Sequence, residues 1–310
     1  MVNDKKTKIN DVLPIVLMGF LFVIIYSLAL LVIGPFEAAG VEPAFENPDN
    51  PMNLVFFFVI IIVMTMVILL IANFWKKQLI QIIILGAIGY TVAYVFYPLF
   101  TFVVPWLFSA VLSIAVAGMI VTILFKYPEW YVVDISGIIV GAGAIAIFGI
   151  SLGVFLVIIL LIGLAIYDAI SVYKTKHMVD LADTVMDLKL PVLLVIPKIR
   201  NYSLIRETKS LKEKLKEGKE REAFFMGLGD VVMPGILVAA IYRNPDITNS
   251  LPIVLSVIFG TLVGFVILMT FVVKGKPQAG LPCLCGGAIL GYVISSYVLF
   301  GELVGLNFAF

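Results

Sequence analysis

Residues 150–173 have the sequence ISLGVFLVIILLIGLAIYDAISVY, an apolar run long enough to cross a bilayer as a helix. One acid, Asp168, interrupts this run. A second apolar run, AFFMGLGDVVMPGILVAAIY at residues 223–242, also contains a single acid, Asp230. Because a charged side chain inside the hydrocarbon layer is costly, an acid at that depth points to function. The two segments therefore predict a membrane fold and the position of a functional site.

The composition indicates a polytopic membrane protein. Of the 310 residues, 62% are hydrophobic and only 13% are charged, and the mean hydropathy is +1.14. Such a chain has too few polar side chains to cover a water-facing surface. The first apolar run is about twenty residues long and no small-residue cleavage site follows it, so we expect a retained span rather than a signal peptide.

The apolar runs predict an all-α polytopic membrane protein with nine transmembrane helices. The expected spans are 12–33, 53–74, 78–97, 101–125, 132–148, 150–173, 222–242, 250–273 and 281–303. The breaks at 97–101 and 148–150 are the weakest. Fusing either pair of spans would leave eight, so the count depends on an independent signal.

The distribution of charge supplies that signal, because cytoplasmic loops carry an excess of Lys and Arg. With nine spans and a cytoplasmic N-terminus, one membrane face receives all of the 21 Lys and Arg residues except Arg243. The first loop on the opposite face carries Glu37, Glu42, Glu46 and Asp49. Removing one weak break would reverse every later loop and destroy this segregation. We therefore expect a cytoplasmic N-terminus and an extracytoplasmic C-terminus.

Three parts follow from this topology. Residues 1–173 form a six-span half, residues 174–221 a hydrophilic cytoplasmic loop, and residues 222–310 a three-span part. Within the loop, residues 203–222 are rich in Lys and Glu and predict a solvated helix or a disordered linker. The apolar sequence LPVLLVIP at 190–197 is too short to span. It could form a strand, an interfacial segment or a loop packed on the bundle.

The two intramembrane acids are expected to belong to one site. By helical rise, Asp168 lies about 9 Å from Lys174 and Asp230 about 13 Å from Arg221, below the same membrane face. Their spans are consecutive and antiparallel, and such helices are commonly neighbours. Two adjacent carboxylates share one proton, since both cannot ionise cheaply. The ionised member can then activate water while the protonated member donates to a carbonyl, as in aspartic proteases.

A transporter or channel is the competing interpretation, because acids within spans also serve as proton or cation relays. Two further acids, Asp134 and Glu302, lie near expected span ends where a carboxylate can reach water, and we assign them no role. Cys283 and Cys285 are the only cysteines and His177 is the only histidine. A zinc or haem site needs more ligands at defined spacings, so we expect neither a metal nor a cofactor.

The sequence resembles a known family at three motifs. Tyr167-Asp168 and Gly227-Leu228-Gly229-Asp230 resemble the YD and GxGD motifs of the presenilin and signal peptide peptidase family, which are intramembrane aspartyl proteases. Pro282-Cys283-Leu284, at the start of the last expected span, is similar to that family's Pro-Ala-Leu motif, with cysteine in place of alanine. Each motif alone recurs by chance. Together they occur in the family's order, and the resemblance covers essentially the whole chain.

The resemblance implies an endopeptidase that cleaves peptide bonds within transmembrane segments, with Asp168 and Asp230 as its catalytic residues. The implied supporting residues are Tyr167, Gly227, Leu228, Gly229, Pro282, Cys283 and Leu284. Its partners would be the lipid bilayer and transmembrane-helix substrates, with no nucleic acid and with a homo-oligomer left open. The expected orientation resembles presenilin rather than signal peptide peptidases. The short chain suggests a microbial, archaeal homologue that works in the cell membrane without partner subunits.

Overall fold

The computed structural model describes residues 2–74, 77–175, 193–199, 202–205, 222–247, 249–273 and 278–306. Within these ranges the chain forms nine α-helices, one π-helical turn and one two-stranded sheet. The helices are α1 (Val2–Ala38), α2 (Met52–Phe74), α3 (Lys77–Thr101), α4 (Trp106–Lys126), α5 (Trp130–Ser151), α6 (Val154–Ile170), α9 (Leu228–Arg243), α10 (Leu251–Val273) and α11 (Leu281–Phe300). The π-helical turn η1 (Ser171–Thr175) continues α6.

The helical membrane architecture expected from the sequence is confirmed. Among the described residues, seven helices are long and apolar enough to cross a membrane. They are α1, α3, α4, α5, α6, α10 and α11. In α2, the described apolar segment is the shorter Met52–Met64. The helix α9 has 16 residues, because the first part of the predicted span at 222–242 is not helical.

Both weak breaks are present, but each lies later in the chain than predicted. The helix α3 continues through Pro98 to Thr101, and α4 begins at Trp106. The predicted start of a span at residue 101 is therefore wrong. Likewise α5 extends to Ser151, and α6 begins only after Gly153. Apolar composition marked the helices correctly, whereas a proline near a helix end did not mark the boundary.

Two antiparallel strands, called the hairpin below, lie in the segment between α6 and α9. Strand β1 (Leu193–Pro197) pairs antiparallel with β2 (Ala223–Gly227), with Val195 opposite Phe225. Of the alternatives considered for residues 190–197, the strand is the one observed. The strand β2 corrects the prediction of helix from residue 222, since its aromatic residues favour a half-buried strand. The expectation for the Lys- and Glu-rich residues 206–221 falls outside the described ranges.

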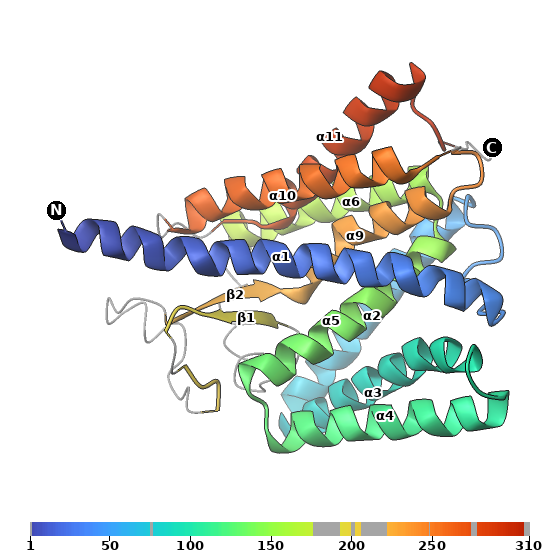
Figure 1. The fold of residues 1–310 in the computed structure, drawn as a ribbon, viewed down its shortest axis with the longest axis horizontal. Coiled ribbons are helices and arrows are strands. Elements are labelled where there is room, and N and C mark those ends of the chain that lie inside the picture. The colour runs from blue at the N-terminus through green and yellow to red at the C-terminus, as the bar shows by residue number, and fades with distance from the viewer. Residues whose placement is uncertain are drawn as a thin grey trace.

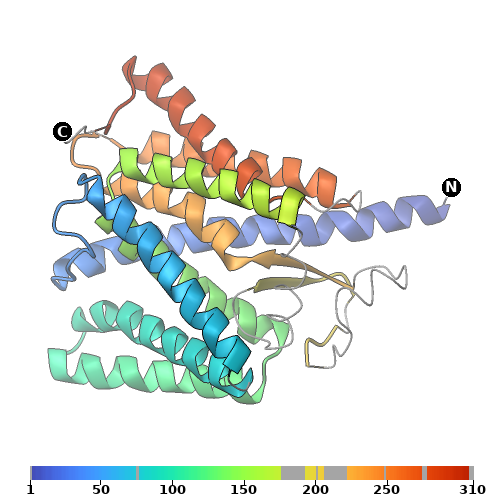
Figure 2. The same ribbon diagram turned by 180° about the vertical axis from the view of Figure 1, so that it is seen from behind.

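The helices form two groups joined by α5. Helix α1 runs along the long axis with α9 and α10 beside it, while α3 and α4 lie together at the far side of α5 (Figure 1). From behind, α6 and α11 lie over α9 (Figure 2). The core between these helices contains Phe22, Tyr26, Ile145 and Leu160, all with no exposed surface. Consequently the three predicted motifs, on α6, α9 and α11, are carried by helices in mutual contact.

Helices α10 and α11 pack backbone to backbone. A Cβ atom placed on Gly260 would overlap the carbonyl oxygen of Gly287, and one on Gly264 would overlap that of Cys283. The same holds for Gly291 against the carbonyl of Ser256. Small residues at such positions let membrane helices approach closely. This contact holds the start of α11 in a defined place.

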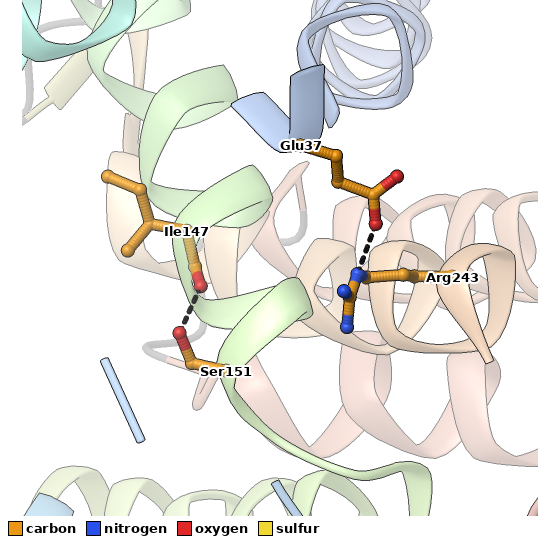
Figure 3. Close-up of polar contacts among 4 residues, drawn as sticks. All are labelled: Glu37, Ile147, Ser151 and Arg243. Carbon is orange, nitrogen blue, oxygen red and sulfur yellow. Dashed lines mark hydrogen bonds and ion pairs between the residues drawn. The ribbon is translucent and has the colours of Figure 1, made fainter. Parts of the chain in front are cut away.

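Polar contacts tie the helix ends far from the hairpin. The Arg243 guanidinium, at the end of α9, donates to the carboxylate of Glu37 at the end of α1 (Figure 3). The Ser151 hydroxyl donates to the Ile147 carbonyl at 2.6 Å (Figure 3) and accepts from the Ala44 amide at 2.8 Å. These bonds connect α1, α5, α9 and the loop after α1.

Candidate active site

Asp168 lies in the last turn of α6 and is 3% exposed. Its Oδ2 accepts a hydrogen bond of 3.1 Å from the backbone amide of Leu281. Leu281 is the first residue of α11, and the preceding Gly280 offers no side-chain cap. The first amides of a helix have no partner within that helix. The carboxylate of α6 therefore satisfies the open N-terminus of α11, which fixes one helix against the other.

Asp230 lies in the first turn of α9, where the chain changes from strand to helix. Strand β2 ends at Gly227, and Leu228 begins the helix. A Cβ on Gly227 would lie 3.3 Å from Oδ2 of Asp230, so the bare glycine backbone packs on this carboxylate. A Cβ on Gly229 would meet nothing within 4 Å. The GLGD sequence thus forms a strand end and a helix start, and not the helix interior that the sequence suggested.

The two carboxylates meet at one dipeptide. A Cβ placed on Gly280 would lie 3.0 Å from Oδ2 of Asp230, and the next amide, that of Leu281, binds Asp168. Covalent geometry then keeps the two carboxylate oxygens within about 10 Å of each other. The structure therefore brings together the two residues that the sequence predicted to form one site.

The residues of the Pro-Cys-Leu sequence continue directly from this dipeptide. Pro282 lies in the first turn of α11, where the missing amide of proline is tolerated. Cys283 is partly buried, with its carbonyl against Gly264 of α10, and Leu284 is completely buried. An apolar groove of about 870 Å³ between α10 and α11 begins at Pro282 and Cys283, and neither catalytic candidate lines it.

The remaining predicted residues have different surroundings. The side chain of Tyr167 is 71% exposed although its neighbour Asp168 is buried. Leu228 is 8% exposed and belongs to the core, packed on Gly141 of α5. Among the described residues, no group of three or more His, Cys, Asp and Glu side chains could hold a metal ion.

The sequence analysis assigned no role to three residues that make contacts at the site or at the strands that lead to it. Gly280 precedes the third motif, and its position there was the only available signal. Tyr26 of α1 is fully buried and donates to the carbonyl of Val231 at 3.0 Å. Asp134 of α5 was expected to reach water, but it is 5% exposed and accepts from the amide of Val195 at 2.8 Å. These contacts join distant parts of the chain, and no local pattern reveals them.

A helical membrane bundle that brings two acids together is the architecture of an intramembrane aspartate protease, and known proteins of that class are similar to this chain. The family model described as "Signal-peptide peptidase, presenilin aspartyl protease" matches residues 19–301. The chain therefore belongs to this family, and it is an aspartic-type endopeptidase of the membrane.

Solved structures agree with the family model. A structure of a presenilin family intramembrane aspartate protease in space group C222 is 32% identical, with a TM-score of 0.70, covering 92% of this chain and 99% of that one. A structure of such a protease in space group P2 is 32% identical, with a TM-score of 0.66, covering 91% and 96%. Among the curated proteins compared, none matches this chain.

Proposed function

We propose that Asp168 and Asp230 are the catalytic pair of this protease and that they hydrolyse peptide bonds within transmembrane segments of membrane proteins. The observation that carries the proposal is their shared contact with Gly280 and Leu281. Two acids on different helices that touch consecutive residues of a third helix are held as a unit. A catalytic pair needs such fixed placement, because small displacements reduce the rate steeply.

The chemistry follows from two carboxyl groups that share one proton. The ionised carboxylate accepts a proton from a water molecule, whose oxygen attacks the scissile carbonyl carbon. The protonated carboxyl donates its proton to the carbonyl oxygen, giving a tetrahedral diol. When the diol collapses, the carboxyl that took the water's proton gives it to the amide nitrogen, the other carboxylate takes a proton from a diol hydroxyl, and the C–N bond breaks. The Leu281 amide keeps Asp168 oriented throughout this sequence by a hydrogen bond to a carboxylate oxygen.

The substrate must present an extended segment to this pair. Carbonyl groups within a helix are engaged in the helix's own hydrogen bonds, so the substrate has to unwind near the site. Strand β2 ends beside Asp230, and an extended segment could pair with its outer edge by strand addition. Pro282 and Cys283 would support the segment from α11, and the buried Leu284 would hold the start of that helix in the core. The exposed ring of Tyr167 is available to contact it next to Asp168.

The test uses purified protein reconstituted with a single-pass substrate. Wild-type protein should release two fragments, and Asp168→Asn and Asp230→Asn should each abolish release. Glu302→Gln is the matched control, since Glu302 is an exposed acid outside the site. If either aspartate variant cleaves at the wild-type rate, the assignment of the pair is wrong. Ion flux measured on the same vesicles tests the relay alternative.

We also propose nine spans, with a cytoplasmic N-terminus and an extracytoplasmic C-terminus. The seven long apolar helices account for seven of these spans, and the other two are α2 and the continuous unit of β2 and α9. Five strand residues add about 16 Å to the roughly 24 Å of α9, which exceeds the thickness of the hydrocarbon core. The start of α1 and the last described residues lie at opposite ends of the molecule (Figure 1), in agreement with an odd number of spans.

In this arrangement residues 1–173 carry Asp168, residues 222–310 carry Asp230 and the Pro-Cys-Leu sequence, and residues 174–221 connect them in the cytosol. Reporter domains that are active on only one side of the cell membrane, fused to each terminus, test the orientation. Active reporters on the same side for both termini would require an even number of spans. Light scattering of the detergent-solubilised protein measures whether the protein forms the homo-oligomer left open by the sequence.

A further inference from the structure

A third buried carboxylate, Asp134, lies outside the proposed catalytic pair. It belongs to the second turn of α5 and is 5% exposed. Its Oδ1 accepts a hydrogen bond of 2.8 Å from the backbone amide of Val195, the central residue of β1. A buried acid in a membrane-spanning helix is costly, so its presence there points to a role. Within the described part of the chain its one hydrogen-bond partner is this strand amide, so the role concerns the hairpin.

The direction of the Val195 amide explains what the contact does. In an antiparallel pair, opposite residues either exchange both backbone hydrogen bonds or exchange none. Val195 stands opposite Phe225, yet its amide is bound to Asp134. The amide therefore points away from β2, along the outer edge of β1. Helix α5 packs on β1 at this edge, and Asp134 satisfies a donor that water cannot easily reach.

The hairpin in turn determines where α9 begins. Strand β2 is held by β1 along its whole length, from Ala223 to Gly227. Gly227 packs on the Asp230 carboxylate, and α9 starts at the next residue. A shift of β1 relative to α5 would move β2 with it. Because no flexible linker separates β2 from α9, that shift reaches the first turn of α9 directly.

We propose that Asp134 is a positioning residue, which anchors the β-hairpin to α5 and thereby holds Asp230 in place for catalysis. This inference rests on the proposed role of Asp230 in the catalytic pair. What the position requires is an oxygen atom that accepts from Val195. Asparagine supplies that oxygen and alanine does not, so the two variants separate the hydrogen bond from the negative charge.

A second acid of the same helix end provides a matched control. Glu129, at the N-cap of α5, accepts from the Ser203 hydroxyl at 2.6 Å and from the Leu204 amide at 3.0 Å. It therefore binds the segment that connects β1 to β2 and has no bond to either strand among the described residues. Glu129→Gln removes a comparable charge without touching the proposed anchor.

The experiment measures kcat and KM per folded molecule for five variants of the full chain reconstituted in liposomes: Asp134→Ala, Asp134→Asn, Val195→Pro, the double variant Asp134→Ala/Val195→Pro, and Glu129→Gln. Val195→Pro removes the donor of the same bond, because proline has no backbone N–H. Hydrogen exchange of the Phe224 and Met226 amides, which face β1 in the bonded pairs of the ladder, reports hairpin anchoring independently of activity. The pH dependence of kcat is recorded for wild type and Asp134→Asn.

We expect Asp134→Ala and Val195→Pro each to lower kcat about tenfold to a hundredfold, with KM changed less than about threefold. The double variant should lose no more than either single variant, because both remove one bond. Asp134→Asn and Glu129→Gln should keep kcat within about threefold of wild type, with an unchanged pH profile. Hydrogen exchange at Phe224 and Met226 should quicken only where the bond is lost.

Other results would overturn the proposal in distinguishable ways. Faster exchange in Asp134→Ala with wild-type kcat would show that the hairpin is anchored but does not position a catalytic group. An Asp134→Asn variant as inactive as Asp134→Ala, or one with a shifted pH profile, would make the charge or proton of Asp134 essential and the positioning role wrong. Failure of Asp230 as a catalytic residue is seen separately, as continued cleavage by Asp230→Asn.

Discussion

Gly280 packs directly on Asp230: a Cβ atom added to this glycine would lie 3.0 Å from the carboxylate oxygen Oδ2. The next residue, Leu281, binds the other acid, Asp168, through its amide. The segment that begins α11 therefore contacts both acids through main-chain atoms. This relationship explains why the Pro-Cys-Leu sequence, which contains no catalytic group, lies at the site. Its preceding backbone sets the spacing of the two acids.

Gly280→Ala should reduce catalysis without unfolding the protein. The backbone of Gly280 has φ −80° and ψ −48°, which alanine adopts freely, so only the contact changes. The Asp230 carboxylate must move by a few tenths of an ångström, and we expect kcat to fall about tenfold. Gly286→Ala in the same helix is the control, because a Cβ there meets nothing within 4 Å. Equal kcat values for the two variants would show that the contact between Gly280 and Asp230 does not affect catalysis.

Gly287→Ala should lower the free energy of unfolding by about 1–3 kcal/mol, because the added methyl group forces α10 and α11 apart. The atom it would meet is the carbonyl oxygen of Gly260, which is backbone and cannot rotate away. Alanine has the better helix propensity by about 1 kcal/mol, so a stabilised variant would mean that helix propensity outweighs packing here. Thermal unfolding in detergent measures the difference, with Gly118→Ala in the open surroundings of α4 as control.

Glu37→Gln should change the unfolding free energy by less than about 0.5 kcal/mol. The Glu37–Arg243 pair joins α1 to α9 (Figure 3), but its side chains are 45% and 38% exposed. Solvent screens such a pair, and exposed ion pairs contribute little. A loss of several kcal/mol, measured by chemical unfolding, would show that this end of the bundle depends on the pair.

The membrane fold could be predicted from the sequence, and the two acids could be singled out, because both depend on strong local signals. Runs of apolar residues mark spans, and Asp168 and Asp230 stand out within them. The segregation of Lys and Arg required a break near residue 100 and another near 150, and both are present. Boundaries were less accurate, since α3 continues through Pro98. Packing against neighbours decides where a membrane helix ends, and composition does not record it.

The supporting contacts could not be predicted, because they join residues far apart in sequence. Asp134 binds Val195 across 61 positions, and Leu281 binds Asp168 across 113. Hydropathy placed Asp134 near a span end, where water would be a natural partner. The hairpin covers that end instead, and β2 replaces helix in front of Asp230. A strand inside an apolar run is hard to distinguish from helix by periodicity alone.

Tyr26→Phe tests whether α1 supports the first turn of α9. Pro234 has no amide to donate to the carbonyl of Asp230, so this part of α9 lacks one helical hydrogen bond. The Tyr26 hydroxyl donates to the adjacent carbonyl, that of Val231, at 3.0 Å. Phenylalanine keeps the ring that packs on Gly235, so the variant removes only the hydroxyl.

We expect Tyr26→Phe to lower the unfolding free energy by about 1 kcal/mol, because one buried hydrogen bond is lost. We also expect a severalfold decrease of kcat, since the bond lies one residue from Asp230. Tyr90→Phe, at a side chain that is 72% exposed, is the control and should change neither quantity. A stability loss without any change of kcat would limit Tyr26 to packing of the core. A decrease of kcat with unchanged KM would place α1 among the elements that hold the catalytic pair.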